Sequence, residues 1–212
     1  MNFLASKINA FCKNNTSVKE DSYETPVLYA LVCFPHSFLY GNCLSIGKRC
    51  VQRLLTWRQS DPEWNKAEAW PASQYPNATM RYMRQAGCLV TSVAMLLRHY
   101  NVVNDSNVKT FNPWVCNEKL KSAGSFNSAA DLIWGKVGNA FSGFQYAGVA
   151  TYSTSKLHEL YKQGYACIVG VNNNGHFVAV KSASASGAVI MDPGNGYTSL
   201  SSFSSVNSIY YV

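Results

Sequence analysis

The spacing of apolar residues predicts a helix that begins close to Cys88 and directly follows Gly87. Positions i, i+4, i+7, i+8 and i+11 of one helix face are all apolar or aromatic: Leu89, Val93, Leu96, Leu97 and Tyr100. Cys88 then lies on the first turn, where unpaired backbone N–H groups and the positive end of the helix dipole favour a thiolate. The segment therefore presents a candidate nucleophile, although a single cysteine in an apolar helix is more often a small buried residue.

A second pattern predicts a β-hairpin after residue 175. Residues 175–181 alternate like a half-buried strand, residues 182–187 are typical of a turn, and residues 188–191 form a second strand that ends in Asp192-Pro193-Gly194. If the turn is centred on Ser184, antiparallel pairing sets His176 directly opposite Asp192 and Ser182 opposite Ser186. Opposed residues on one face lie about 5 Å apart at Cβ.

Cys88, His176 and Asp192 together have the chemistry of a thiol-nucleophile triad. Such a triad needs a base beside the nucleophile and a third group that orients the base. The alternative is that His176 and Asp192 simply end two ordinary strands, but this does not explain why both fall at the same end of one hairpin. Asp192→Asn should be milder than Cys88→Ser, since an amide can still orient the ring.

Most of the chain resembles a known family, the papain-clan cysteine peptidases related to the double-glycine leader peptidases of bacteriocin exporters, in the free-standing form found in phages and Gram-positive bacteria. The similarity extends over about residues 55–212 and includes a helical insert from Asn112 to Trp134 and a helix near Leu157 that leads into a core strand. Four motifs carry it: Gln59-Ser-Asp61-Pro62-Glu-Trp64, Gly87-Cys88-Leu-Val-Thr91-Ser92-Val-Ala94-Met95, Gly175-His176-Phe-Val-Ala-Val180 and Asp192-Pro193-Gly194.

This resemblance implies an α+β papain-like fold, with a helical half, an antiparallel sheet and an active site in the cleft between them. It makes Cys88 the nucleophile, His176 the general base and acid, and Asp192 the group that orients the imidazole. The oxyanion-hole glutamine is expected to be Gln59, with Gln85, three residues before the nucleophile, as the alternative. No metal or organic cofactor is required.

Residues 1–54 are expected to form a separate N-terminal extension with a docking or regulatory role, and residues 55–212 the peptidase domain. The apolar run from Val27 to Leu44 is too interrupted for a confident membrane span, and no secretory signal pattern opens the chain. The cysteines of the extension lack the close spacing of a zinc site: Cys12, Cys33, Cys43 and Cys50. Cys116 and Cys167 are expected to be buried packing residues.

The composition and net charge of the chain indicate what kind of partner it could bind. A chain of 212 residues with 47% hydrophobic content can bury a sizeable core, and a formal net charge of +7 favours an anionic polymer such as a bacterial cell wall. No nucleic-acid module is recognised, which argues against nucleic acid as the partner.

The leading hypothesis is a cysteine endopeptidase of peptidoglycan. It would act as a phage lysin or as a virion-associated enzyme, either carried by the particle or released at host lysis. The extension could then contact other virion proteins. Two alternatives stay open: a protein-processing peptidase, and a non-catalytic structural virion protein that retains the fold.

Overall fold

A computed structural model describes residues 56–65, 67–103 and 110–212. The predicted extension, residues 1–54, lies outside the described residues, and so do the run from Val27 to Leu44 and the cysteines of that extension. The boundary between residues 54 and 55 therefore stays a prediction. Among the helices of the described ranges, none has the length and apolar character needed to cross a membrane.

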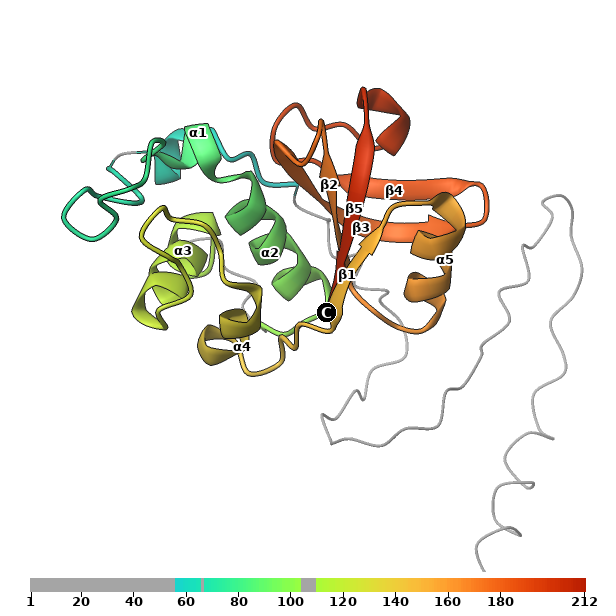
Figure 1. The fold of residues 1–212 in the computed structure, drawn as a ribbon, viewed down its shortest axis with the longest axis horizontal. Coiled ribbons are helices and arrows are strands. Elements are labelled where there is room, and N and C mark those ends of the chain that lie inside the picture. Colours follow the sequence, from blue (N-terminus) through green and yellow to red (C-terminus); the bar gives the residue numbers. More distant parts are fainter. Residues whose placement is uncertain (1–55, 66, 104–109) are drawn as a thin grey trace, which may run out of the picture. The chain divides into compact units, whose positions relative to one another are not determined.

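One half of the described part of the chain is helical (Figure 1). It contains α1 (Met83–Ala86), α2 (Cys88–His99), α3 (Pro113–Ser122) and α4 (Val137–Ala140), with short 3-10 turns η1 (Pro62–Trp64) and η2 (Trp134–Lys136). The insert expected from Asn112 to Trp134 is helical only in α3, since the residues from Ala123 to Ile133 form no helix. The first turn of α3 forms because the Asn112 side chain accepts a hydrogen bond from Val115 N at 3.0 Å and Pro113 fits the first helical position.

The other half is a five-stranded antiparallel sheet with the strand order β1-β5-β2-β3-β4. The strands are β1 (Gly148–Thr151), β2 (Cys167–Val171), β3 (His176–Ser184), β4 (Gly187–Met191) and β5 (Val206–Tyr211). The helix α5 (Thr154–Lys162) packs on β3, and a 3-10 turn η3 (Leu200–Ser202) precedes β5. Helices plus an antiparallel sheet confirm the expected α+β class.

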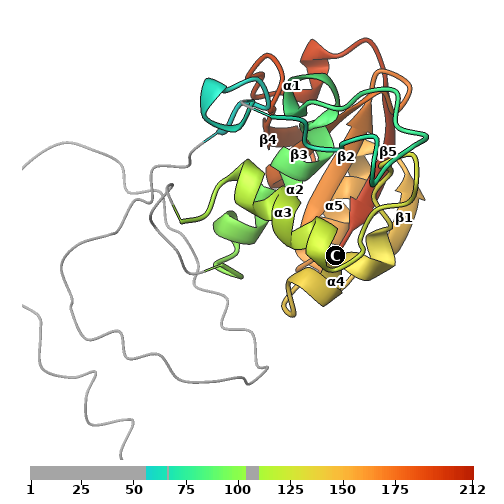
Figure 2. The ribbon, with the colours of Figure 1, turned by 90° about the vertical axis from the view of Figure 1, so that its left-hand side faces the viewer.

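The two faces of the sheet contact different helices. Figure 1 and Figure 2 place α2 between α3 and the sheet, with α5 on the other side of the strands. The side chains of β2 and β3 alternate accordingly: Ile168 and Ala179 pack into the core of the helical half, whereas Val169 and Val178 pack with Leu157 of α5. Both faces of the central strands are therefore buried.

The predicted start of α2 at Cys88 is confirmed, and most of the predicted face is buried: Val93, Leu96 and Leu97 are at most 2% exposed, whereas Tyr100, just after the helix, is 39% exposed. Val90, Ala94 and Met95, which lie off that face, are buried as well. Because α2 is enclosed by α3 on one side and β3 on the other, it is buried on nearly all sides. The apolar periodicity predicted the position of the helix, but it does not show how many other elements pack against it.

The hairpin of β3 and β4 exists, but its predicted register is wrong. Ser182 pairs with Val189 rather than with Ser186, and the tip pair is Ser184 with Gly187. Gly187 has φ +145°, a conformation that glycine adopts readily, and its carbonyl oxygen accepts a hydrogen bond from the Ser184 hydroxyl at 3.1 Å. The turn is therefore tighter and lies further along the chain than the serine-rich segment indicated.

Candidate active site

Cys88 begins α2 at a corner that only glycine can form. Gly87 N donates to Met83 O at 2.7 Å, and a Cβ on Gly87 would lie 2.4 Å from that same oxygen. This close approach ends α1 and lets α2 begin at the next residue. The Cys88 side chain is consequently held at the helix N-terminus, where it is 8% exposed.

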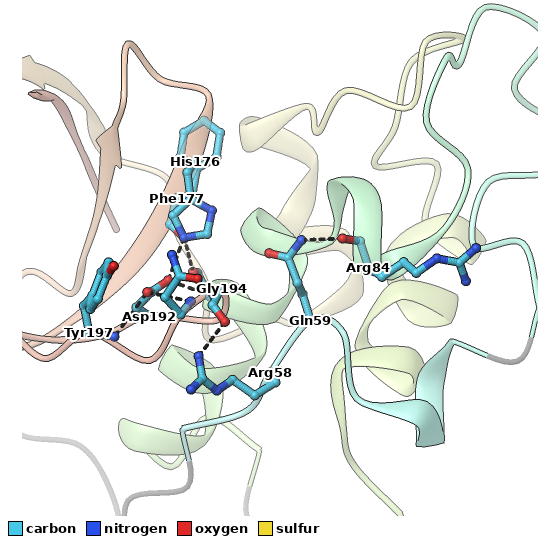
Figure 3. Close-up of polar contacts among 10 residues, drawn as sticks. Arg58, Gln59, Arg84, His176, Phe177, Asp192, Gly194 and Tyr197 are labelled. Carbon is cyan, nitrogen blue, oxygen red and sulfur yellow. Dashed lines mark hydrogen bonds and ion pairs between the residues drawn. The ribbon is translucent and has the colours of Figure 1, made fainter. Parts of the chain in front are cut away.

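His176 and Asp192 lie in direct contact, as Figure 3 shows. His176 Nε2 is 2.6 Å from Asp192 Oδ1, and Asp192 is completely buried. Because Nε2 faces the carboxylate, Nδ1 is the ring nitrogen left for another partner.

A β-bulge produces this contact. The tip register, continued along the hairpin, would set Asp192 opposite Ala179; the irregularity between Val180 and Ser182 shifts the pairing so that Ala179 pairs with Met191 instead. One residue further, Asp192 comes opposite Val178, and it then shares a sheet face with His176 because side chains alternate. The two residues meet diagonally rather than as the directly opposed pair that the sequence predicted.

Backbone N–H groups hold Asp192 in its charged form. Gly194 N donates to Oδ1 at 2.8 Å, while Asn195 N and Tyr197 N donate to Oδ2 at 2.9 and 3.2 Å (Figure 3). Burial acts to raise the pKa of Asp192, but the hydrogen bonds from His176, Gly194 and Tyr197 and the charge of His176 lower this pKa to about 2. The carboxylate is thus a fixed anion.

Cys88 belongs to the same group of side chains. Burial acts to lower the pKa of His176, but hydrogen bonds to Asp192 and Cys88, together with the charges of both, raise this pKa to about 9. The structure therefore brings Cys88, His176 and Asp192 together, with the imidazole between the sulfur and the carboxylate.

Gln59 is fixed near the α1–α2 corner. Its backbone N donates to Pro193 O at 2.9 Å, and its side-chain Nε2 donates to Arg84 O at 3.0 Å (Figure 3). An amide nitrogen carries two hydrogens, so one donor of Gln59 remains available. Gln59 Oε1 is buried and has no hydrogen-bond partner within the described residues.

The side-chain oxygen of Gln85 accepts hydrogen bonds at the start of α1. Gln85 is exposed, and its Oε1 accepts hydrogen bonds from Arg81 N and Tyr82 N, both at 3.1 Å. This carbonyl thereby satisfies backbone donors at the start of α1. The amide nitrogens of both glutamines keep hydrogens that could be donated, so Gln59 stays the prediction and Gln85 its alternative.

Sequence reasoning missed the residues that hold the Gln59 segment. The Arg58 guanidinium donates from Nη1 to Gly194 O, which ties this segment to the loop after Asp192. Asn65 Nδ2 donates to Gln59 O at 2.9 Å, and Asn65 Oδ1 accepts from Arg84 N at 2.7 Å. Asn65 directly follows the Gln59–Trp64 motif, but no spacing marks an asparagine that bridges two loops.

The other cysteines of the described ranges have a different environment. Cys116 and Cys167 are both fully buried, which confirms them as packing residues. Burial raises the pKa of the Cys116 thiol, and it raises that of Cys167 to about 12. Within the described part of the chain, no cluster of histidine, cysteine or carboxylate side chains could hold a metal ion.

The model of the Peptidase C39-like family matches residues 69–210, which include Cys88, His176 and Asp192. No curated protein and no solved structure shows significant similarity to the chain. On the family match, which covers well over half of its length, the chain belongs to the Peptidase C39-like family of cysteine peptidases.

Proposed function

We propose that the protein is a cysteine endopeptidase in which Cys88, His176 and Asp192 act as a triad. The single observation that carries this proposal is the position of the His176 imidazole, which contacts the buried Asp192 at 2.6 Å and lies close enough to Cys88, at the head of α2, for the two side chains to interact. A nucleophile, a base and a group that orients the base are the parts that thiol acyl transfer requires.

The reaction follows from these positions. His176 is protonated at neutral pH because its pKa is raised to about 9, and in the proposed reaction the attacking species is a Cys88 thiolate paired with this imidazolium. The sulfur bonds to the peptide carbonyl carbon, and the developing oxyanion accepts hydrogen bonds from Cys88 N–H and the free amide hydrogen of Gln59. His176 then gives its proton to the leaving amine as the C–N bond breaks, which leaves a thioester. Water, deprotonated by His176, attacks the thioester and releases the acid.

The pH dependence follows from the same imidazole. We expect kcat/KM to fall as pH rises through about 9, because His176 then loses the proton that pairs it with the thiolate. The stability of the folded protein should also fall as pH rises. A raised histidine pKa stabilises the fold fully below the unfolded value, about 6.5, and this contribution is lost as pH rises through about 9. Initial rates and melting temperatures between pH 6 and pH 10 test both expectations. A rate that keeps rising past pH 10 would contradict the ion-pair mechanism.

Gly194 provides a test of how closely the imidazole must be placed. A Cβ at Gly194 would lie 3.0 Å from His176 Cε1 and 3.2 Å from Asp192 Oδ1, so the ring would have to move by a few tenths of an ångström. We expect Gly194→Ala to lower kcat/KM by about 10- to 100-fold while the protein stays folded. Gly135→Ala is the matched control, because no atom lies within 4 Å of its added Cβ, and it should keep full activity. Equal activity of the two variants would show that the ring position is not critical.

Bacterial cell-wall peptide is one candidate substrate. The net charge of +7 and the resemblance to peptidases of phages and Gram-positive bacteria support an enzyme that acts on a polyanionic wall, carried by a phage particle or released at host lysis. Binding to purified walls should weaken as salt rises, since the screening length falls to about 8 Å at physiological ionic strength and below that at higher salt.

A polypeptide is the other candidate substrate, and a specific observation favours it. An apolar cavity of about 320 Å³, to which Cys88 itself contributes, lies beside the proposed nucleophile. Wall peptides are built largely of small and charged residues, which offer little to such a cavity, whereas proteins contain large apolar side chains.

Incubation with both substrate classes separates these candidates. Purified peptidoglycan and an unfolded test protein are incubated with the enzyme and with Cys88→Ala, and new amino termini are measured by labelling and mass spectrometry. New termini from peptidoglycan alone support the wall enzyme, and new termini from the protein alone support the processing peptidase. If neither is cut and Cys88 resists alkylation, a structural protein that retains the fold is the better description.

The proposed role of residues 1–54 in docking has its own test. If they form a separate element, a chain that begins at residue 55 should keep a cooperative melting transition and a reactive Cys88, while its assembly or targeting changes. Insolubility of the shortened chain, or loss of the cooperative transition, would assign residues 1–54 to the core of the peptidase domain.

A further inference from the structure

Gln59 is connected to α1 by a closed ring of three hydrogen bonds. Its side-chain Nε2 donates to Arg84 O at 3.0 Å, as Figure 3 shows, and Arg84 N donates to Asn65 Oδ1 at 2.7 Å. Asn65 Nδ2 completes the ring by donating to Gln59 O at 2.9 Å. Each of the three residues donates one bond and accepts one, so the loss of any side chain from the ring opens it.

The ring is attached to the segments that carry the proposed nucleophile and the orienting carboxylate. Arg84 lies in α1, four residues before Cys88, so an amide bonded to Arg84 O is held near the start of α2. On its other side, the backbone N of Gln59 donates to Pro193 O at 2.9 Å, in the residue directly after Asp192. Gln59 is therefore fixed relative to both ends of the triad.

Asn65 is itself held in place by the short turn before it. Its Nδ2 also donates to Asp61 O at 2.9 Å, which is a second bond within the same turn. Trp64, the preceding residue, is only 2% exposed, and its Nε1 donates to Arg58 O at 2.8 Å. The buried indole and the bonds of the Asn65 amide thus fix the Gln59 segment before any substrate binds, as a site that must be preorganised requires.

From these contacts we infer that Asn65 is a positioning residue, which holds the Gln59 amide so that its free hydrogen reaches the oxyanion of the tetrahedral intermediate. The inference rests on the proposed peptidase function and on Gln59 as its oxyanion donor. Such a donor stabilises the transition state only if it is in place before the negative charge develops. Arg84 O takes one of the two amide hydrogens of Gln59, so the ring sets the direction of the other.

Two reagents separate the oxyanion donor from the nucleophile. With p-nitrophenyl acetate, the Cys88 sulfur bonds to the acetyl carbon, negative charge develops on the carbonyl oxygen, and p-nitrophenolate leaves. With iodoacetamide, the sulfur displaces iodide directly and no oxyanion forms. The acylation rate is the release of p-nitrophenolate after subtraction of the rate for Cys88→Ala. The alkylation rate is followed by mass spectrometry of the peptide that contains Cys88.

Asn65→Ala is expected to slow acylation about 10-fold and Gln59→Ala about 10- to 100-fold, while the alkylation rate of Cys88 stays within about twofold of the wild type. When Gln59 is already alanine, Asn65→Ala should have almost no further effect, because no donor remains to be positioned. Asn112→Ala is the matched control. It also removes an asparagine hydrogen bond of 3.0 Å, to Val115 N at the start of α3, and should leave both rates unchanged.

Each other outcome overturns a defined statement. The role of Asn65 is wrong, and the peptidase proposal survives, if Asn65→Ala acylates at the wild-type rate, if it slows acylation and alkylation alike, or if its effect persists in full alongside Gln59→Ala. If Gln85→Ala slows acylation and Gln59→Ala does not, Gln85 is the donor and the inference also fails. A wild-type Cys88 that is not alkylated, or that accepts no acetyl group, contradicts the peptidase proposal itself.

Discussion

Replacement of Cys88 by alanine is expected to lower kcat/KM by at least about 10⁴-fold and to leave the melting temperature nearly unchanged. The sulfur is the atom that would bond to the substrate, and no other described cysteine lies beside an imidazole held by a carboxylate. The change removes one buried atom from a small side chain, so only a modest effect on stability is expected. Hydrolysis of a protein substrate and the thermal transition are measured on the same preparations.

Selective alkylation provides the matching chemical measurement. Iodoacetamide should label Cys88 before Cys116 and Cys167, because burial raises the pKa of both of those thiols and shields them from the reagent. Cys116→Ala is the matched control, since it removes a cysteine that lies outside the proposed triad. Loss of hydrolysis in a folded Cys116→Ala protein, or full activity in folded Cys88→Ala, would contradict the assignment.

The sequence predicted those parts of the fold that depend on local patterns. Gly87 and the apolar residues after Cys88 located the start of α2, whereas a helix after Asn112 was expected from the family resemblance. The signal at Gly87 and Cys88 is strong because backbone geometry within one or two turns determines it. The burial of α2 on nearly all sides depends on α3 and β3, which are distant in the chain, so periodicity alone could not show it.

The hairpin of β3 and β4 shows the same limit, because local patterns did not fix the register of its two strands. Alternation predicted which segments form β3 and β4, but it did not locate the tip at Ser184 and Gly187 or the bulge before Ser182. The predicted and observed registers near His176 differ by two residues, and a shift of two keeps each side chain on its face of the sheet. His176 and Asp192 therefore still meet, although as diagonal neighbours.

The surroundings of the candidate site were the least predictable part. Arg58 and Asn65 contact residues more than a hundred and about twenty positions away, respectively, and their partners are backbone groups, which leave no trace in side-chain patterns. The backbone donors around Asp192 belong to a turn whose conformation becomes evident only in the structure. That turn changes the expected effect of altering Asp192.

Asp192→Asn is expected to lower kcat/KM by about 10²- to 10⁴-fold and also to destabilise the protein. An amide can still orient the imidazole only if its oxygen takes the place of Oδ1, next to His176 Nε2 and Gly194 N. Its NH₂ group then takes the place of Oδ2, where Asn195 N and Tyr197 N both point hydrogens at it. The opposite orientation sets the NH₂ group against Gly194 N instead, so neither satisfies every donor.

Unsatisfied donors around a fully buried group cost about 1–3 kcal/mol each, and each kcal/mol lowers the melting temperature of a domain of this size by about 2–4 °C. The variant should therefore be less stable than the sequence alone suggested, where only the orientation of the ring was considered. Asp61→Asn is the matched control, because the Asp61 carboxylate accepts a single hydrogen bond within the described residues, from Glu63 N at 2.9 Å, and asparagine caps a helix turn equally well. If the Asp192→Asn protein has the same melting temperature as the wild type, the turn from Gly194 to Tyr197 rearranges readily. The carboxylate would then be needed for its charge rather than for the geometry that it fixes.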